Sequence, residues 1–244
     1  MMPKKFRRHC KIGIVNCLIR RCFINMPPEK KPFNHCPLCA SAQINPFAQD
    51  KKRNYQRCTS CALVFADPAT WPSLSDEKSV YDLHENHIDD AGYNRFLQRI
   101  VEPLIERIPT QSRILDFGCG PAPALANQIT NLGHQVNLYD VFYFPEPSVL
   151  CELYDAIVLT EVIEHLHTPL ATLQSLWEQL HPNGVLGIMT QRVIDADKFM
   201  SWQYKNDPTH VCFYAQETFT WLAQDLRATR CEFVGRDMVF LHKR

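Results

Sequence analysis

Four of the eleven cysteines form two Cys-x-x-Cys pairs, with 18 residues between Cys39 and Cys58. Two thiolates joined by a tight turn bind one metal ion together, and this spacing is typical of tetrahedral zinc held by two knuckles. We therefore predict a closed, structural Zn²⁺ site. Its four ligands are Cys36, Cys39, Cys58 and Cys61. Four unligated buried cysteines and a redox dithiol are the alternatives.

A glycine-rich loop follows an apolar segment, 113–117, which we expect to be a strand. Gly118 and Gly120 let the backbone turn tightly and approach a ligand, and the helix expected over 122–132 offers unpaired N–H groups at its start. Asp140 ends the next expected strand, where a carboxylate can accept both hydroxyls of a ribose. The combination predicts a nucleotide-type cofactor site, with an ordinary strand-end turn as the alternative for Asp140.

Titratable side chains gather where later strands are expected to end. Glu161, Glu164 and His165 follow one strand, and the stretch 202–214 after the next strand is dense in aromatic and titratable residues. His210 is our first candidate for a general base near neutral pH, His165 is the second, and Asp207 would orient one of them. A structural hydrogen-bonding role is the alternative for each histidine.

The elements that must position these residues follow from hydrophobic periodicity and turn residues. Helices are expected over 92–108 (bent or interrupted at Pro103), 122–132, 170–180 and 217–226. Strands are expected over 55–57, 63–65, 113–117, 135–139, 156–160, 185–190, 231–235 and 238–242. Strands that alternate with helices predict an α/β fold with a mostly parallel sheet, and the last strand pair predicts one antiparallel strand at its edge.

Three motifs, in this order, resemble those of class I S-adenosylmethionine-dependent methyltransferases. They are the loop from Asp116 to Gly120, the segment from Tyr154 to Leu166, and the turn from His181 to Ile188 before the fifth strand. The resemblance covers roughly residues 110–244 and implies a Rossmann-like fold that binds S-adenosyl-L-methionine. It implies that Asp116 lies near the cofactor's amino group and that Glu161 and Val162 lie beside the sulfonium. The cofactor-binding residues it implies are Asp116, Phe117, Gly118, Cys119, Gly120, Asp140, Val141, Glu161 and Val162.

Two departures from the family pattern concern the adenine side. Ala122 replaces the usual third glycine, and only about 14 residues separate Asp140 from the fourth strand. That is too few for the usual helix, third strand and second helix, so we expect a sheet shortened at the third-strand edge. Phe142, Tyr143 or Phe144 would then cover the adenine, with simple edge packing as the alternative.

The organisation along the chain follows from these assignments. We expect a basic, disordered extension over 1–31, a zinc-ribbon-like module over 32–70, a helical linker and lid over 71–110, and the Rossmann-like methyltransferase domain over 111–244. The formal net charge is +0, which gives no overall field for nucleic acid or membrane. No segment is long and apolar enough for a secretory signal or a membrane span, so we expect a cytoplasmic protein.

The function expected from these features is methyl transfer by direct displacement to a small-molecule acceptor. The segment 202–214 is similar to the substrate segment of small-molecule methyltransferases, where an Asp-x-Thr-His stretch such as 207–210 recurs. A zinc module ahead of such a domain also resembles a group of ribosomal-RNA methyltransferases, so RNA is the alternative acceptor. A zinc-ribbon interaction protein without catalysis is the third possibility. The acceptor atom and the oligomeric state stay open.

Overall fold

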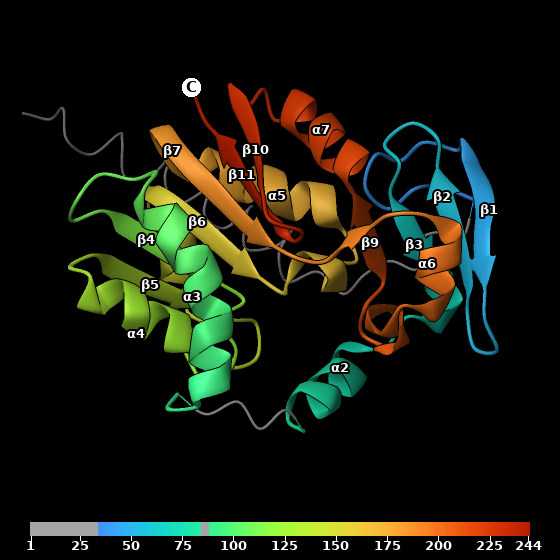
Figure 1. Ribbon diagram of the computed structural model, residues 1–244, viewed down its shortest axis with the longest axis horizontal. Coiled ribbons are helices and arrows are strands. Elements are labelled where there is room, and N and C mark those ends of the chain that lie inside the picture. Colours follow the sequence, from blue (N-terminus) through green and yellow to red (C-terminus); the bar gives the residue numbers. More distant parts are fainter. Residues whose placement is uncertain (1–33, 84–87) are drawn as a thin grey trace, which may run out of the picture.

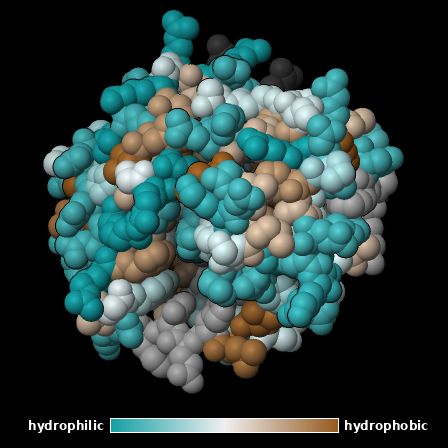
Figure 2. Space-filling view, turned by 45° about the vertical axis from the view of Figure 1, so that its right-hand side comes forward, coloured by the Kyte–Doolittle hydropathy of each residue, from teal (hydrophilic) through white to brown (hydrophobic). Residues whose placement is uncertain are grey.

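The computed structural model describes residues 34–83 and 88–244, which form two β-sheets lying next to each other (Figure 1). The basic segment 1–31 lies outside the described residues. No helix in the described part of the chain is long and apolar enough to cross a membrane. On the face shown in Figure 2, polar side chains predominate, and apolar ones are scattered over several elements.

The larger sheet has six strands in the order β10-β11-β7-β6-β4-β5. They are β4 (Arg113–Phe117), β5 (Gln135–Tyr139), β6 (Tyr154–Thr160), β7 (Leu180–Met189), β10 (Arg230–Val234) and β11 (Met238–His242). β5, β4, β6 and β7 run parallel, which confirms the mostly parallel Rossmann-like sheet. The antiparallel strand is β11, and it lies between β7 and β10 rather than at the expected edge.

Helices cover both faces of this sheet because its strands alternate their buried side chains between two apolar clusters. Ile114 and Val158 face α3 (Ala91–Ile105) and α4 (Ala124–Asn131). Leu115 and Ile157 face α5 (Pro169–Glu178) and α7 (Gln216–Asp225), and Figure 1 shows the resulting layers. α3 continues through Pro103 and ends at Ile105, so the expected interruption does not occur.

The sheet ends at β5 on one side. After Asp140 the chain makes a single bridge with Phe144, forms a short 3-10 helix, η2 (Pro147–Cys151), and enters β6 directly. In the described residues no strand lies beyond β5, which confirms the shortened edge. The physical reason is the one expected: about 14 residues cannot hold a helix, a strand and a second helix.

The smaller sheet joins the cysteine module to the C-terminal half, with the order β1-β2-β3-β9-β8. β1 (Ile44–Gln49), β2 (Asn54–Cys58) and β3 (Val64–Ala66) come from the module, whereas β8 (Arg192–Val193) and β9 (Cys212–Ala215) come from the predicted methyltransferase domain. β9 pairs antiparallel with β3. The sequence predicts a substrate segment over 202–214 and no strand there, whereas its last three residues, from Cys212, begin a buried strand of this sheet.

Short elements connect the two sheets. The chain leaves β3 through η1 (Pro68–Thr70) and α2 (Leu74–Tyr81), where the Ser73 side chain caps the helix by accepting from the Asp76 N–H. The segment that leads to β9 contains α6 (Ala196–Ser201) and η4 (Gln203–Asn206), and η3 (Ile163–His165) follows β6. α2, η3 and η4 bring the titratable residues toward the carboxyl ends of the parallel strands.

Candidate active site

The four predicted metal ligands come together in two knuckles with the same backbone geometry. In each knuckle the residue after the second cysteine donates its N–H to the carbonyl of the first at 2.9 Å: Ala40 to Cys36, and Ala62 to Cys58. Both alanines adopt left-handed backbone angles, with φ of 57° and 60°. The only sequence feature that the two knuckles share is the pattern Cys-x-x-Cys-Ala. The two pairs therefore present their thiols in the same way.

The sulfur atoms lie at distances suited to one metal ion. The Sγ atoms of Cys36 and Cys61 are 3.5 Å apart, and those of Cys39 and Cys58 are 3.4 Å apart. All four lie within 4.8 Å of one another. Zn–S bonds of about 2.3 Å in a tetrahedron place sulfurs about 3.8 Å apart, which these distances approach. Cys36, Cys58 and Cys61 are buried within the same apolar cluster as β6 and β7 side chains.

A cavity of about 520 Å³ opens at the carboxyl ends of β4, β5 and β6. This is where ligands bind in open α/β sheets. One wall is formed by residues 117–122, 139–143 and 160–162. We call it the cofactor-side wall, because it contains the glycine loop and the strand ends where the motifs predict the cofactor. The opposite wall, which we call the acceptor-side wall, contains the predicted catalytic residues and consists of Glu77, Tyr81, His165, Leu166, His167, Thr168, Tyr204, Asp207 and His210.

The glycine loop on the cofactor-side wall is shaped by close packing. Gly118 has a φ of 77°, and a Cβ there would lie 2.5 Å from Val162 Cγ2. Its N–H donates to the Tyr139 carbonyl at 2.7 Å. Gly120 also has a positive φ, of 64°, but a Cβ there would meet no described atom within 4 Å. Gly118 is thus required by the protein itself, whereas Gly120 leaves room beside the cavity.

Asp116 lies beneath this loop and is 3% exposed. Its Oδ2 atom has no hydrogen-bond partner among the described residues. Burial, and then the charge of Asp140, raises its pKa from 3.8 to about 7. A buried carboxylate without a partner is costly, and a cationic ligand group would satisfy it. Asp116 itself is not among the residues that line the cavity, so such a group would have to reach past the loop.

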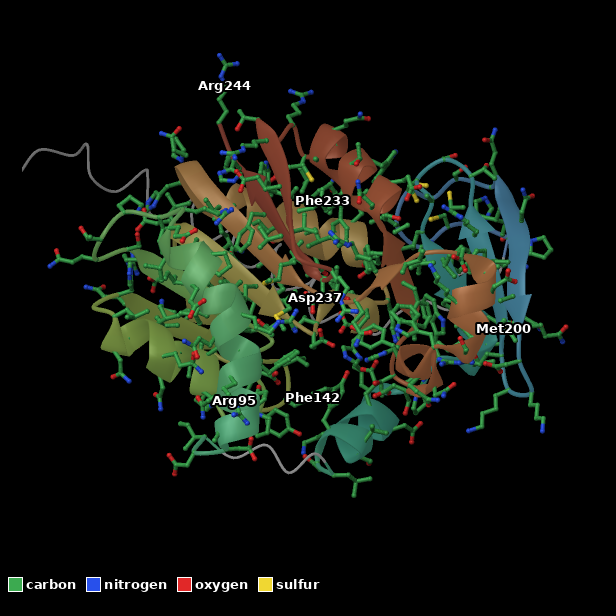
Figure 3. The ribbon with its side chains drawn as sticks, viewed as in Figure 1. Arg95, Phe142, Met200, Phe233, Asp237 and Arg244 are labelled. Atoms are coloured by element: carbon green, nitrogen blue, oxygen red, sulfur yellow. The ribbon has the colours of Figure 1, made fainter. Side chains whose placement is uncertain are left out.

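Asp140 closes the turn after β5. Its Oδ1 accepts from the N–H groups of Phe142 and Tyr143, at 2.8 and 3.1 Å, and its Oδ2 accepts from the Gly120 N–H at 3.0 Å. Val141, Phe142 and Tyr143 all line the cavity, and Phe142 lies between α2 and α3 (Figure 3). Phe144, the third aromatic considered for the adenine, pairs with Asp140 instead and is not a lining residue.

Glu161 and Val162 continue the cofactor-side wall at the end of β6. Glu161 adopts a φ of 53°, which is unusual for a residue other than glycine, asparagine or aspartate. Burial and then the neighbouring Glu164 carboxylate raise the pKa of Glu161 to about 8. Such strain and such pKa shifts are found preferentially at functional sites.

Glu164 is a buried carboxylate that forms hydrogen bonds behind the acceptor-side wall. It is fully buried, and its carboxylate accepts from the hydroxyls of Tyr204 and, at 2.9 Å, Thr190. Burial raises its pKa, while the charge of His210 and the Tyr204 hydrogen bond oppose that rise. The Thr190 and Tyr204 hydroxyls lie 3.1 Å apart and complete a buried polar network.

The three predicted catalytic residues come together above this network. The rings of His165 and His210 lie 4.6 Å apart, centre to centre. Nδ1 of His165 bonds to the Thr209 carbonyl at 3.1 Å, and Nδ1 of His210 bonds to the Tyr204 carbonyl at 2.6 Å. Because a carbonyl only accepts, each Nδ1 carries the hydrogen, which leaves Nε2 as the basic nitrogen of a neutral ring.

Asp207 lies beside His210, with 3.9 Å between its Oδ2 and Nε2 of the ring. Burial raises the pKa of this carboxylate, but hydrogen bonds from the Thr209 hydroxyl and N–H, at 2.5 and 2.8 Å, hold the pKa below its ordinary value. Asp207 is therefore an anion near neutral pH.

The comparison with protein families decides what this arrangement is. A family model described as a methyltransferase domain matches residues 89–226, more than half of the chain. The chain belongs to this family. Together with its motifs and its sheet, the match identifies a class I S-adenosylmethionine-dependent methyltransferase.

Solved structures share the fold of this methyltransferase at low sequence identity. One is a SAM-dependent methyltransferase from Archaeoglobus fulgidus, with 13% identity, a TM-score of 0.51, and 62% of this chain and 94% of that chain covered. Another is 1,6-didemethyltoxoflavin-N1-methyltransferase from Burkholderia thailandensis, with bound 1,6-didemethyltoxoflavin and S-adenosylhomocysteine. It has 14% identity, a TM-score of 0.50, and coverage of 82% and 99%. The search of curated protein sequences finds no match.

Two residues of the methyltransferase's acceptor-side wall escaped the sequence analysis. Glu77 on α2 and His167 after η3 are buried in the wall, with 3.3 Å between Oε1 and Nε2. In the described structure neither atom has a hydrogen bond of good geometry. Glu77 sits on the buried side of a short, mostly polar helix, and the His167 ring packs at a tilt against Trp71, with 4.7 Å between the ring centres. Neither carries a motif, so only their meeting in space marks them.

Proposed function

We propose that this protein transfers a methyl group from S-adenosyl-L-methionine to a small-molecule acceptor. The observation that carries the proposal is a single cavity with the glycine loop on one wall and His165, Asp207 and His210 on the other. A volume of about 520 Å³ falls in the range of small-ligand sites. The Burkholderia enzyme, which has the same fold, holds 1,6-didemethyltoxoflavin together with S-adenosylhomocysteine, and this supports a small-molecule acceptor here.

The cofactor would occupy the cofactor-side wall. The buried, unpaired Oδ2 of Asp116 suits the ammonium group of the cofactor. The absence of a side chain at Gly120 leaves room for the cofactor to approach the backbone of the loop. Asp140 already accepts three backbone N–H groups, which leaves about one of the four lone-pair sites of its carboxylate for a ribose hydroxyl. Phe142 and Tyr143, which both line the cavity, are the candidates to cover the adenine.

The bound cofactor would supply an electrophilic methyl group, so most of the acceleration would come from the way the residues of the cavity position the acceptor. The acceptor-side wall orients the acceptor, and Nε2 of His210 takes the proton that the acceptor loses. Asp207 stabilises the imidazolium that results, and the Tyr204 carbonyl fixes the ring by holding Nδ1–H. His165 contacts His210 and stays the second candidate for the base.

We further propose that the four cysteines hold a structural Zn²⁺. The near-tetrahedral sulfur distances and the matched knuckles fit this metal, and four thiolates leave no open position for catalysis. One zinc per chain by elemental analysis supports the assignment. A folded protein that contains no metal after purification contradicts it.

Calorimetric titration with S-adenosylmethionine tests the cofactor site. We expect one site per chain and a loss of affinity of about tenfold or more in Asp116→Asn, because a buried charge-assisted hydrogen bond contributes on that scale. Asp195→Asn, which alters an exposed cap at the start of α6, is the matched control. An Asp116→Asn variant with unchanged affinity removes Asp116 from the cofactor site.

The nature of the acceptor is tested with methyl-labelled cofactor and two extracts, one of small metabolites and one of total RNA. We expect label in the metabolite fraction, lost in His210→Gln although that variant still binds S-adenosylhomocysteine. RNA is the weaker candidate because, of the four basic residues clustered in the module, Arg53 is buried and Arg57 half-buried, which leaves Lys51 and Lys52 exposed. Label in RNA that falls steeply with salt would reverse this conclusion.

A further inference from the structure

We propose that Arg53 is a positioning residue of the active site, which fixes the loop carrying Asp207 and His210 from the neighbouring cysteine module. The proposal rests on the function proposed above. It assigns to the module a part in forming the acceptor-side wall, in place of substrate docking at a distance.

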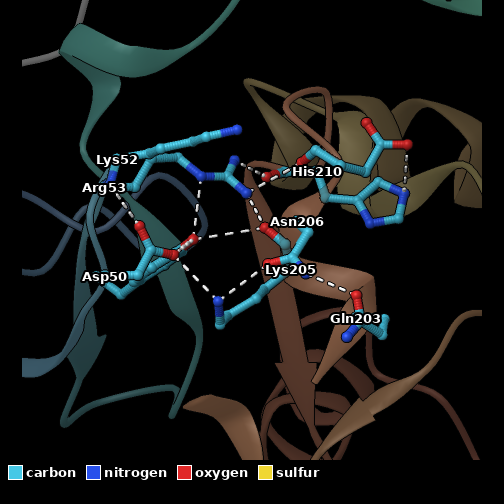
Figure 4. Close-up of polar contacts among 9 residues, drawn as sticks. Asp50, Lys52, Arg53, Gln203, Lys205, Asn206 and His210 are labelled. Carbon is cyan, nitrogen blue, oxygen red and sulfur yellow. Dashed lines mark hydrogen bonds and ion pairs between the residues drawn. The ribbon is translucent and has the colours of Figure 1, made fainter. Parts of the chain in front are cut away.

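Arg53 reaches from the start of β2 into the loop before β9 (Figure 4). Its Nη1 donates to the His210 carbonyl at 2.8 Å, and its Nη2 donates to the carbonyls of Lys205 and, at 3.0 Å, Asp207. Its Nε donates to the Tyr55 hydroxyl at 3.0 Å. The residue is 8% exposed, so these bonds form away from water. The planar guanidinium reaches these three carbonyls and the Tyr55 hydroxyl with a rigid set of five donors, whereas a lysine ammonium has only three donors at a single point.

The Arg53 hydrogen bonds form one clasp between the turn before β2 and the loop before β9, and an ion pair between Lys205 and Asp50 forms a second clasp between the same two segments. Lys205, 5% exposed, places its Nζ 3.1 Å from Asp50 Oδ2, which also accepts from the Tyr55 hydroxyl at 3.0 Å. Burial raises the pKa of Asp50, but the N–H groups of Lys52 and Arg53 and the Lys205 ammonium hold the pKa well below its ordinary value. The carboxylate is thus an anion, and the clasp is charged on both sides.

The clasped carbonyls bracket the catalytic candidates. Arg53 binds the carbonyls of residues 205, 207 and 210, so the backbone on both sides of the Asp207 carboxylate and at His210 itself is fixed. His210 in turn holds its ring through the carbonyl of Tyr204, next to the clasp. Loss of Arg53 leaves three buried carbonyls without their charged donor, and the loop must then move to find other partners.

The test uses full-length protein with S-adenosylhomocysteine, and therefore needs no known acceptor. Arg53→Gln and Arg53→Lys are compared with Lys52→Gln, which removes one positive charge from the neighbouring, exposed position. Three quantities are measured: the affinity for S-adenosylhomocysteine, amide hydrogen exchange along the chain, and the tautomer and pH titration of the His210 ring by long-range proton–nitrogen NMR.

We expect exchange of the amides of Thr209, His210 and Val211 to rise about tenfold or more in Arg53→Gln, since a lost charge-assisted hydrogen bond has that effect. The His210 ring should lose its fixed Nδ1–H tautomer. Arg53→Lys should show both changes to a smaller degree, and it carries the test if Arg53→Gln does not fold. The affinity for S-adenosylhomocysteine should stay within about twofold, and Lys52→Gln should match the parent protein.

Two results overturn the proposal. One is a parent-like tautomer and exchange at His210 in either Arg53 variant. The other is a rise in exchange that is equal in β4 and β6, which would make Arg53 a residue of general stability only. A parent protein that does not bind S-adenosylhomocysteine would overturn the proposed function instead, and the tautomer and exchange results would still decide the role of Arg53.

Discussion

The cofactor-side wall of the cavity comes from three strand ends in one sheet, whereas the acceptor-side wall combines segments that are distant along the chain. On the cofactor side, backbone groups do most of the holding: Gly118 N–H binds the Tyr139 carbonyl, and Gly120 N–H binds Asp140. On the acceptor side, buried charged side chains hold the backbone, and Arg53 and His210 are 157 residues apart. The first wall is formed within one sheet, while the second also depends on the cysteine module, which lies outside the residues 89–226 matched by the family model.

The two walls of the cavity therefore depend on different parts of the chain. A loop that is held by its own strand and helix keeps its geometry when residues in a distant segment are substituted, since its contacts are local. A loop held by a neighbouring module changes whenever that module does. We therefore expect damage to the module to affect the acceptor side first and cofactor binding last, and the following four changes test that order.

The largest effect is expected from the double variant Cys58→Ser and Cys61→Ser. The free energy of unfolding should fall by several kcal/mol, because the variant would lose the proposed structural Zn²⁺ and because these sulfurs lie within the apolar cluster shared by both sheets. Urea unfolding together with zinc analysis measures it. Cys231→Ser, half-buried and outside the sulfur cluster, is the control and should cost about 1 kcal/mol or less. A double variant as stable as its parent would show that the four-cysteine site does not stabilise the fold.

Next in size is Gly118→Ala, which breaks the cofactor-side wall. Strain at a positive φ and the contact of 2.5 Å with Val162 together should cost about 4 kcal/mol of unfolding free energy. Gly120→Ala should cost only about 1 to 2 kcal/mol, from the strain alone. Its new Cβ would take cofactor space, so its larger effect should be on S-adenosylmethionine affinity. Thermal unfolding and calorimetry of both variants check this contrast. Equal losses of unfolding free energy in the two variants would show that the contact with Val162 does not matter.

A third change, Asp116→Asn, acts through pH. The pKa of Asp116 in the folded protein is raised to about 7, above its ordinary value of 3.8, so ionisation of this buried acid destabilises the fold. That cost is absent below the ordinary value and grows as the pH rises to about 7. At pH 8 the cofactor-free variant should be more stable than the parent, by on the order of 2 kcal/mol, and the gain should vanish near pH 4. Unfolding titrations at both pH values decide it, and a gain independent of pH contradicts it.

The smallest effect is expected where the two walls touch. The Tyr143 hydroxyl on the cofactor side donates to Asp82, just after α2, at 2.7 Å. This contact is exposed to water, so Tyr143→Phe should leave the melting temperature nearly unchanged. Release of S-adenosylhomocysteine should become faster if α2 helps to close the cavity. Stopped-flow release rates measure this, with Tyr154→Phe, in the interior of the sheet, as a control that should alter stability and leave release unchanged.

Much of the fold and of the cofactor-side wall could be predicted from the sequence. The parallel strands, the shortened edge after Asp140 and the glycine loop all follow from patterns within a few tens of residues. The acceptor-side wall could be predicted only as a list of candidates, His165, Asp207 and His210, because their orientation depends on carbonyls of other residues. Glu77 and His167 lie in segments without a motif, and nothing in the sequence around Arg53 marks it as a buried residue.

The sequence by itself determined the four-cysteine spacing, the loop from Asp116 to Gly120 and the α/β order of the chain. Periodicity and turn chemistry act over short distances, so these features are visible in one dimension. Only the tertiary structure decided that β9 completes the module's sheet, that Arg53 is buried and that His210 presents Nε2. The first two depend on contacts between segments far apart in the chain, such as Arg53 and His210, which are 157 residues apart, and local preference does not specify such partners. The third depends on the Tyr204 carbonyl, six residues from His210, whose position the irregular loop between them sets.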